Sequence, residues 1–192
     1  MRATGPGQSA LLLLDVIAVL DKFQVDYAVV GAMAASFYGP VRASLDADAI
    51  ISFKGQTSLE NLERELKKAG FDTQLRRGDH DDPISAVLVA ADEHGNRVDL
   101  LLGLRGMEAA AFARAVEVQF MNEPVRIIGI EDFIAMKVFA GSPKDIDDAR
   151  NALAVSGQDL DADLLRKITR QYGRQELDIL EQLLTDNRKT ED

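Results

Sequence analysis

The sequence contains no cysteine, which excludes disulfide bonds, thiolate zinc sites and cysteine nucleophiles. Imidazoles are almost as scarce, because His80 and His94 are the only histidines and both lie in polar stretches typical of loops. Long apolar runs are also lacking: residues 11–14 are aliphatic, but Asp15 ends the run, which is too short to cross a membrane. Nothing in this pattern indicates export, so we expect a cytoplasmic protein with no membrane partner.

Basic charge is in short supply as well. Lysine and arginine together number 22 against 32 aspartates and glutamates, which gives a formal net charge of −10. A chain of this charge is not expected to grip long nucleic acids through a broad basic face. Local basic clusters remain, either as contacts to an RNA acceptor or as solvated faces: Lys67, Lys68, Arg76, Arg77, Arg166, Lys167, Arg170 and Arg174.

The length of 192 residues allows one domain with a proper core, or a compact domain with a helical appendage. Residues 1–9 are rich in Gly, Pro and Ser and are expected to form a flexible N-terminus. We expect the core of the fold in residues 10–130 and a helical region packed on it in residues 131–192.

Apolar spacing predicts helices over residues 10–23, 59–69 and 107–115, another from Gly31 to about Gly39, and nearly continuous helix from Glu131 onward. Strands are predicted over residues 25–30, 46–53, 71–75, 86–91, 98–102, 116–121 and 125–128, with hairpin turns at 92–96 and 122–124. Most strands precede most helices, so the predicted class is α+β (mixed α/β), with a mixed sheet followed by a C-terminal bundle of three or four helices.

Two aspartates, Asp46 and Asp48, lie in one predicted strand. Residues two apart in a strand point to the same face, so these carboxylates project side by side and repel each other unless a cation lies between them. Mg²⁺ is suited to the position, because it prefers carboxylate oxygens together with waters and substrate phosphates. The alternative is a solvated pair at a strand end.

A third acid, Asp99, is isolated within another apolar strand. If the two strands are neighbours, three carboxylates converge as two-metal phosphoryl transfer requires, and Asp99 is then also a candidate general base. The alternative is that Asp99 faces water from an edge strand.

The segment upstream of Asp46 contains groups suited to phosphate. Gly31 opens a helix directly after a buried strand, where a missing side chain allows phosphate oxygens to approach backbone N–H groups. Arg42 and Ser44 follow. The guanidinium of Arg42 either forks onto a phosphate or forms a salt bridge to Asp46.

These segments together resemble the polymerase-β-like nucleotidyltransferases, and are most similar to the AbiEii-type branch found in bacterial toxin–antitoxin and phage-defence systems. There, Gly-Gly or Gly-Ser opens a helix and Arg-x-Thr precedes Asp-x-Asp; the matching residues are Gly31, Ala32, Arg42, Ser44, Asp46 and Asp48. Residues 97–101 resemble the strand of the third acid, 130–137 the helix with a characteristic lysine, and 144–148 the following Arg/Lys-Asp motif. The resemblance spans residues 25–150.

The resemblance implies roles for further residues. Lys137 would contact the nucleotide phosphates or the leaving group, and Asp145 would position that lysine or the nucleotide; the alternative for Lys137 is an exposed lysine on an amphipathic helix. Two residues depart from the family pattern. Ala32 permits backbone contact to phosphate but removes a hydroxyl, and Ser44 replaces the usual threonine.

The implied activity is a nucleotidyltransferase with two Mg²⁺ ions, which moves an NMP group from an NTP such as ATP to a hydroxyl of an RNA (tRNA) or protein acceptor. The catalytic candidates are Asp46, Asp48, Asp99 and Lys137, the first three as metal ligands; the nucleotide-binding candidates are Gly31, Ala32, Arg42, Ser44, Lys137 and Asp145. Such a protein would be the toxin-like member of a toxin–antitoxin system, with a cognate antitoxin or toxin as its partner. The alternatives are a non-catalytic interaction module of this fold and a small-molecule (antibiotic) nucleotidyltransferase.

Overall fold

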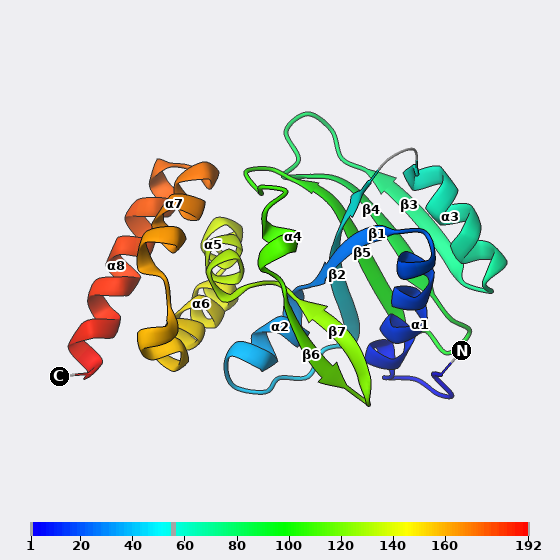
Figure 1. Ribbon diagram of the computed structural model, residues 1–192, viewed down its shortest axis with the longest axis horizontal. Helices are drawn as coiled ribbons and strands as arrows, with labels where there is room; N and C mark the ends of the chain where they lie inside the picture. Colours follow the sequence, from blue (N-terminus) through cyan, green and yellow to red (C-terminus); the bar gives the residue numbers. More distant parts are fainter. Residues whose placement is uncertain (1, 55–56, 192) are drawn as a thin grey trace. The chain divides into compact units, whose positions relative to one another are not determined.

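The computed structural model describes residues 2–54 and 57–191 (Figure 1). The chain divides into two compact units. The first comprises residues 1–33, 43–105 and 115–127, and the second comprises residues 34–42, 106–114 and 128–192. The boundaries expected at residues 9/10 and 130/131 stay predictions.

A seven-stranded sheet forms the first unit, in the order β3-β4-β5-β2-β1-β7-β6. The strands are β1 (Val25–Val29), β2 (Asp46–Phe53), β3 (Asp72–Arg77), β4 (Ile84–Ala91), β5 (Arg97–Leu104), β6 (Val116–Phe120) and β7 (Glu123–Ile127). β2 runs parallel to β5 and β1 runs parallel to β7, whereas the other neighbouring pairs are antiparallel. The predicted mixed sheet is confirmed.

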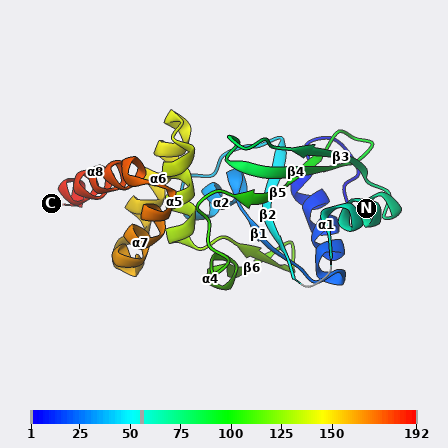
Figure 2. The same cartoon turned by 90° about the horizontal axis from the view of Figure 1, so that it is seen from above.

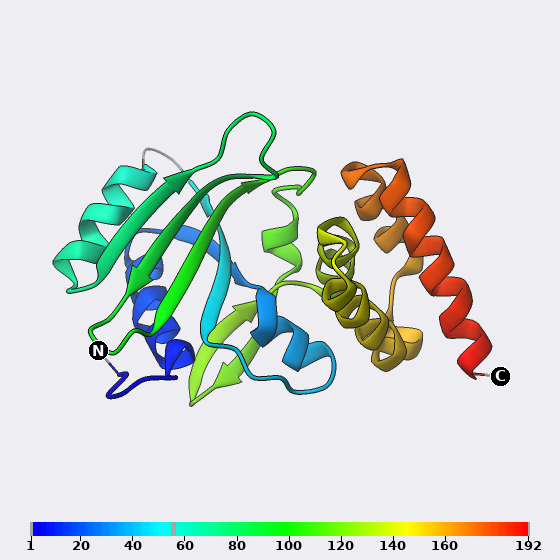
Figure 3. The ribbon, with the colours of Figure 1, turned by 180° about the vertical axis from the view of Figure 1, so that it is seen from behind.

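One face of this sheet is covered by α1 (Ser9–Lys22) and α3 (Leu59–Lys68), as Figures 2 and 3 show. All leucines of α1 and α3 except Leu11 are buried, and they face the alternate, inward-facing residues of the strands, such as Ala49 and Leu100, both fully buried. Burial of these apolar side chains is the main force that holds the helices on the sheet. The polar members of the same strands therefore lie on the opposite face.

The hairpin between β6 and β7 turns earlier than predicted. Met121 and Asn122 form the turn with φ angles of 52° and 65°, and Pro124 lies within β7, in register with Gln119. A two-residue hairpin loop needs positive φ at both central residues, and asparagine accepts that conformation at low cost. The turn expected over residues 122–124 therefore starts one residue late and ends two residues late.

The second unit is helical and includes α4 (Ala111–Arg114), α5 (Ile130–Ala140), α6 (Pro143–Ser156), α7 (Ala162–Tyr172) and α8 (Arg174–Glu191). Phe133 of α5, Leu153 of α6 and Leu165 of α7 are all buried, and α5 packs on both α6 and α7. The predicted C-terminal bundle is confirmed, with α5 to α8 as its four helices.

Of two further helices, α2 matches the expectation and α4 differs from it. α2 (Gly31–Tyr38) begins at the predicted glycine. α4 is shorter than the helix expected over residues 107–115, because residues before Ala111 form turns instead and the Glu108 side chain accepts a hydrogen bond from Gln171 of α7. Within residues 2–54 and 57–191, no helix has both the length and the apolar character needed to span a membrane.

Candidate functional site

The two acids of β2 share the face of the sheet that α1 and α3 leave open. Asp46 and Asp48 are partly buried, whereas the intervening Ala47 and the following Ala49 are fully buried against the helices. This alternation follows from the two-residue period of a strand. The structure therefore places both carboxylates side by side, as their spacing predicts.

β5 lies beside β2 and brings the third acid to the same face. The parallel register pairs Asp48 with Asp99 and Asp46 with Arg97. Residues in register on neighbouring strands point the same way, so three acids and one arginine share one small area. The condition set by the sequence, that the two acid-bearing strands be neighbours, is met.

Arg97 holds Asp99 in a two-pronged ion pair. Its Nε donates to Asp99 Oδ1 at 2.5 Å and its Nη2 donates to Asp99 Oδ2 at 2.5 Å. The hydrogen bonds to Asp99 raise the pKa of the Arg97 guanidinium, and the negative charges of Asp46 and Asp48 contribute in the same direction. Sequence reasoning missed Arg97, although its position two residues before Asp99 in a strand was a sufficient signal.

Gly31 sits against Asp48 at the point where β1 leads into α2. Its φ is +60°, and a Cβ built there would overlap the Asp48 carboxylate and lie 2.8 Å from Cγ. The Val30 N–H donates to the Asp48 backbone oxygen at 2.9 Å, which fixes the end of β1 to β2. Glycine is thus required both for the backbone conformation and for the space that Asp48 occupies.

Asp46 and Asp48 are better placed to bind a divalent metal ion than Asp99 is. Asp46 and Asp48 are hard oxygen donors on one face, which fits a Mg²⁺ ion completed by water and phosphate oxygens. Both oxygens of Asp99 accept a hydrogen bond from Arg97, so Arg97 competes with a metal ion for this carboxylate. Accordingly, the described residues contain no group of three or more acids or histidines arranged to hold a metal ion.

The second unit contains a separate charged cluster around Lys137 of α5. Its Nζ lies 2.7 Å from Asp145 Oδ1 and 2.8 Å from Asp148 Oδ2, both on α6, and its side chain is only 12% exposed. Burial raises the pKa of Asp145, but hydrogen bonds from Lys137 and from the Ser142 hydroxyl outweigh it, so the pKa lies below its ordinary value. The expected pairing of Lys137 with Asp145 is present, and the alternative of an exposed lysine is wrong.

Arg42 belongs to this second cluster. Its Nη2 lies 3.1 Å from Asp148 Oδ2, whereas the sequence left a choice between a phosphate and Asp46. Arg42 Nε and Nη1 are buried and have no hydrogen-bond partner among the described residues. Ser44, in contrast, is an exposed loop residue, and Ala32 is buried in α2.

Known proteins resemble this chain in fold, but sequence comparison assigns it to no family. No family model matches the chain, and no curated protein matches it. A solution structure of the antibiotic-resistance factor ANT(2'')-Ia superposes with a TM-score of 0.59 at 14% identity, over 86% of this chain and 91% of the other.

Two further solved structures are similar. A nucleotidyltransferase-like protein from Paracoccidioides brasiliensis has a TM-score of 0.52 at 18% identity, covering 86% of this chain and 88% of its own. The lincosamide antibiotic adenylyltransferase LnuA has a TM-score of 0.50 at 12% identity, covering 80% and 99%. The chain therefore has the nucleotidyltransferase fold, and the chemistry must be argued from its own residues.

Proposed function

We propose that the protein is a nucleotidyltransferase, which moves an NMP group from an NTP to an acceptor hydroxyl. The observation that carries the proposal is the parallel register of β2 and β5, which sets Asp48 beside Asp99 with Asp46 on the same open face. Gly31 adds to it, because its missing side chain leaves room for the Asp48 carboxylate. The nucleotidyltransferase fold supports the same reaction class.

In the proposed reaction, the acceptor oxygen attacks the α-phosphorus and forms a new P–O bond. The bond from the α-phosphorus to the α,β-bridging oxygen breaks, and pyrophosphate leaves with that electron pair. Asp99 accepts the hydroxyl proton at a lone pair of a carboxylate oxygen that Arg97 does not occupy. Asp46 and Asp48 would hold Mg²⁺, with Asp99 contacting a second ion; such ions neutralise phosphate charge and lower the pKa of the hydroxyl.

Within the second unit, Arg42 and Lys137 are the proposed phosphate contacts. Support comes from the two guanidinium nitrogens of Arg42 that lack a partner and from the buried position of Lys137. Asp145 would position Lys137, to which it lies at 2.7 Å. Gly31, Ala32 and Ser44 are proposed as backbone or hydroxyl contacts to the nucleotide.

The acceptor divides the proposal into two candidates. Resemblance of residues 25–150 to the AbiEii-type branch favours RNA or protein as the acceptor, ATP or another NTP as the donor, and a toxin-like role beside an antitoxin. The likeness to ANT(2'')-Ia and LnuA favours a small molecule, since the solved structures include ANT(2'')-Ia with adenylyl-2''-tobramycin and LnuA with lincomycin. A non-catalytic interaction module is the third possibility and predicts no acid-dependent nucleotide binding.

The test is incorporation of α-labelled NTPs, with Mg²⁺, into cellular RNA, protein and small-molecule fractions. The wild type is compared with the Asp46→Ala/Asp48→Ala double variant, and tobramycin and lincomycin are added in separate arms. Label found only with the wild type supports nucleotidyl transfer, and the labelled fraction identifies the acceptor. Equal labelling by both proteins would refute the assigned role of the acids, and no label in any fraction would favour the interaction module.

A further inference from the structure

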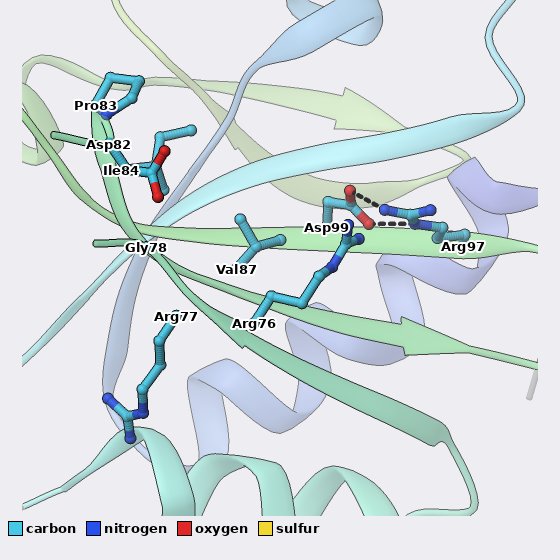
Figure 4. A pocket seen from close by; sticks show the side chains of 9 residues that line it. All are labelled: Arg76, Arg77, Gly78, Asp82, Pro83, Ile84, Val87, Arg97 and Asp99. Carbon is cyan, nitrogen blue, oxygen red and sulfur yellow. Dashed lines mark hydrogen bonds and ion pairs between the residues drawn. The ribbon is translucent and has the colours of Figure 1, made fainter. Parts of the chain in front are cut away.

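A cavity of about 360 Å³ lies on the open face of β3, β4 and β5, next to the third acid (Figure 4). Its lining includes Asp99 and Arg97 of β5, Val87 of β4, Asp82, and both Arg76 and Arg77 of β3. All of these residues belong to the first unit. A hydroxyl compound bound in the cavity would therefore lie beside the proposed general base.

Both arginines of β3 line the cavity, but their guanidinium groups lie on opposite sides of the strand (Figure 4). Arg77 is in register with the buried Ala86, points toward α3 and forms an ion pair with Glu60 (Figure 4). Arg76 is in register with Val87 and extends toward Asp99 on the open face. Within residues 2–54 and 57–191, Arg76 has neither a hydrogen-bond acceptor nor an ion-pair partner from its side chain.

The other charges that line the cavity have partners. Arg97 is neutralised by the two-pronged contact with Asp99, and the Asp82 carboxylate accepts a hydrogen bond from the Asp79 N–H at 2.8 Å. Arg76 is therefore the guanidinium available to a ligand. In a chain with a net charge of −10, a concave site that offers an unpaired guanidinium favours an anion over a cation.

We propose that this cavity binds the acceptor, and that the acceptor is a hydroxyl compound carrying a phosphate group, which Arg76 contacts while the hydroxyl faces Asp99. The inference rests on the proposed function and narrows its substrate class. The volume is at the low end for small-molecule pockets and suits one nucleotide or sugar phosphate. A polycationic acceptor is disfavoured, because it would place positive charge against Arg76.

The proposal is tested by direct binding, without NTP or metal, of ribose 5-phosphate, uncharged ribose and a ribodinucleoside monophosphate with a free 3′-hydroxyl. Isothermal titration is carried out on the wild type, Arg76→Gln and Arg77→Gln. The two variants lose the same charge one residue apart, so Arg77→Gln controls for the general electrostatic effect. Thermal unfolding of each variant checks that it is folded, which the exposed position of Arg76 leads us to expect.

We expect a phosphate probe to bind the wild type, Arg76→Gln to weaken that binding about tenfold, and Arg77→Gln to change it less than twofold. Tighter binding of ribose 5-phosphate identifies a small phosphate monoester as the acceptor type, and tighter binding of the dinucleotide identifies an RNA end. Equal losses in the two variants, or ribose bound as tightly as ribose 5-phosphate, would overturn the proposal.

Failure of this inference is distinguishable from failure of the proposed function. Binding of Mg²⁺-NTP is measured separately, with Asp46→Asn/Asp48→Asn as its negative variant. If Arg76→Gln loses phosphate binding but the wild type binds no Mg²⁺-NTP, the cavity assignment is supported and the proposed enzyme activity is not. If NTP binding depends on Asp46 and Asp48 but the phosphate probes do not bind, the proposed enzyme activity is supported and the anionic acceptor is refuted.

Discussion

Replacing Gly31 with alanine tests the closest packing in the candidate site. The new Cβ would overlap the Asp48 carboxylate, and the residue would keep a φ of +60° that alanine disfavours. Gly95 provides the matched control, because its φ is +79° and no atom lies within 4 Å of a Cβ built there. Both variants therefore impose backbone strain, and only Gly31→Ala displaces an acid.

The expected magnitudes follow from these two contributions. A left-handed conformation costs a non-glycine residue about 1–2 kcal/mol, which applies to Gly31→Ala and to Gly95→Ala alike. Turning the Asp48 side chain away from a preferred rotamer adds about 0.5–1.5 kcal/mol in Gly31→Ala alone. We therefore expect a loss in the free energy of unfolding of about 1.5–3.5 kcal/mol for Gly31→Ala and about 1–2 kcal/mol for Gly95→Ala.

Urea unfolding measures the stability, and titration with Mn²⁺ and ATP measures the site. Gly31→Ala should weaken metal-dependent ATP binding at least tenfold, because Asp48 is displaced, whereas Gly95→Ala should leave it unchanged. Equal losses of stability together with unchanged ATP binding in both variants would refute the reasoning, since Asp48 would then have room that the structure does not give it.

Three further outcomes are expected. Arg97→Gln frees the Asp99 carboxylate, so Mn²⁺ should bind more tightly than to the wild type in isothermal titration; weaker binding would show that Arg97 does not compete with metal. Lys137→Met removes one of the positive charges that neutralise Asp148, whose side chain is only 9% exposed. The free energy of unfolding, measured in urea, should therefore fall by about 3 kcal/mol, and a loss under about 0.5 kcal/mol would contradict the buried pairing. The pKa of Asp145 is lower in the folded than in the unfolded protein, so its ionised form stabilises the fold at pH values above the unfolded pKa of about 4. This contribution is lost as the pH falls through the folded pKa, and the stability difference between the wild type and Asp145→Asn should therefore vanish in strong acid. A stability difference that does not depend on pH would contradict this expectation.

Much of the candidate site follows from short-range rules that a sequence exposes. The two-residue period of a strand puts Asp46 and Asp48 on one face, and the change from a buried strand to small helix-forming residues marks Gly31 as the start of a helix. These features depend only on neighbours along the chain, which is why the β2 bounds and the start of α2 were predicted to the residue.

Contacts between segments far apart in the sequence could not be predicted from local patterns. The partner of Arg42 is Asp148, more than a hundred residues away, and local pattern gave no reason to prefer it over Asp46. The cavity beside Asp99 depends on the antiparallel register of β3 and β4, which separates the roles of Arg76 and Arg77. From the sequence alone these arginines were a single basic cluster, because only the register assigns each of them to a face.

The most direct test of the central claim uses ATP labelled either at the α- or at the γ-phosphate, with Mg²⁺ and the cell fraction that takes up α-label in the incorporation test. The account predicts that α-label enters the acceptor, that γ-label leaves as pyrophosphate, and that Asp48→Asn abolishes both. Transfer of γ-label to the acceptor, or α-label transfer that survives Asp48→Asn, would contradict nucleotidyl transfer at the acids of β2 and β5.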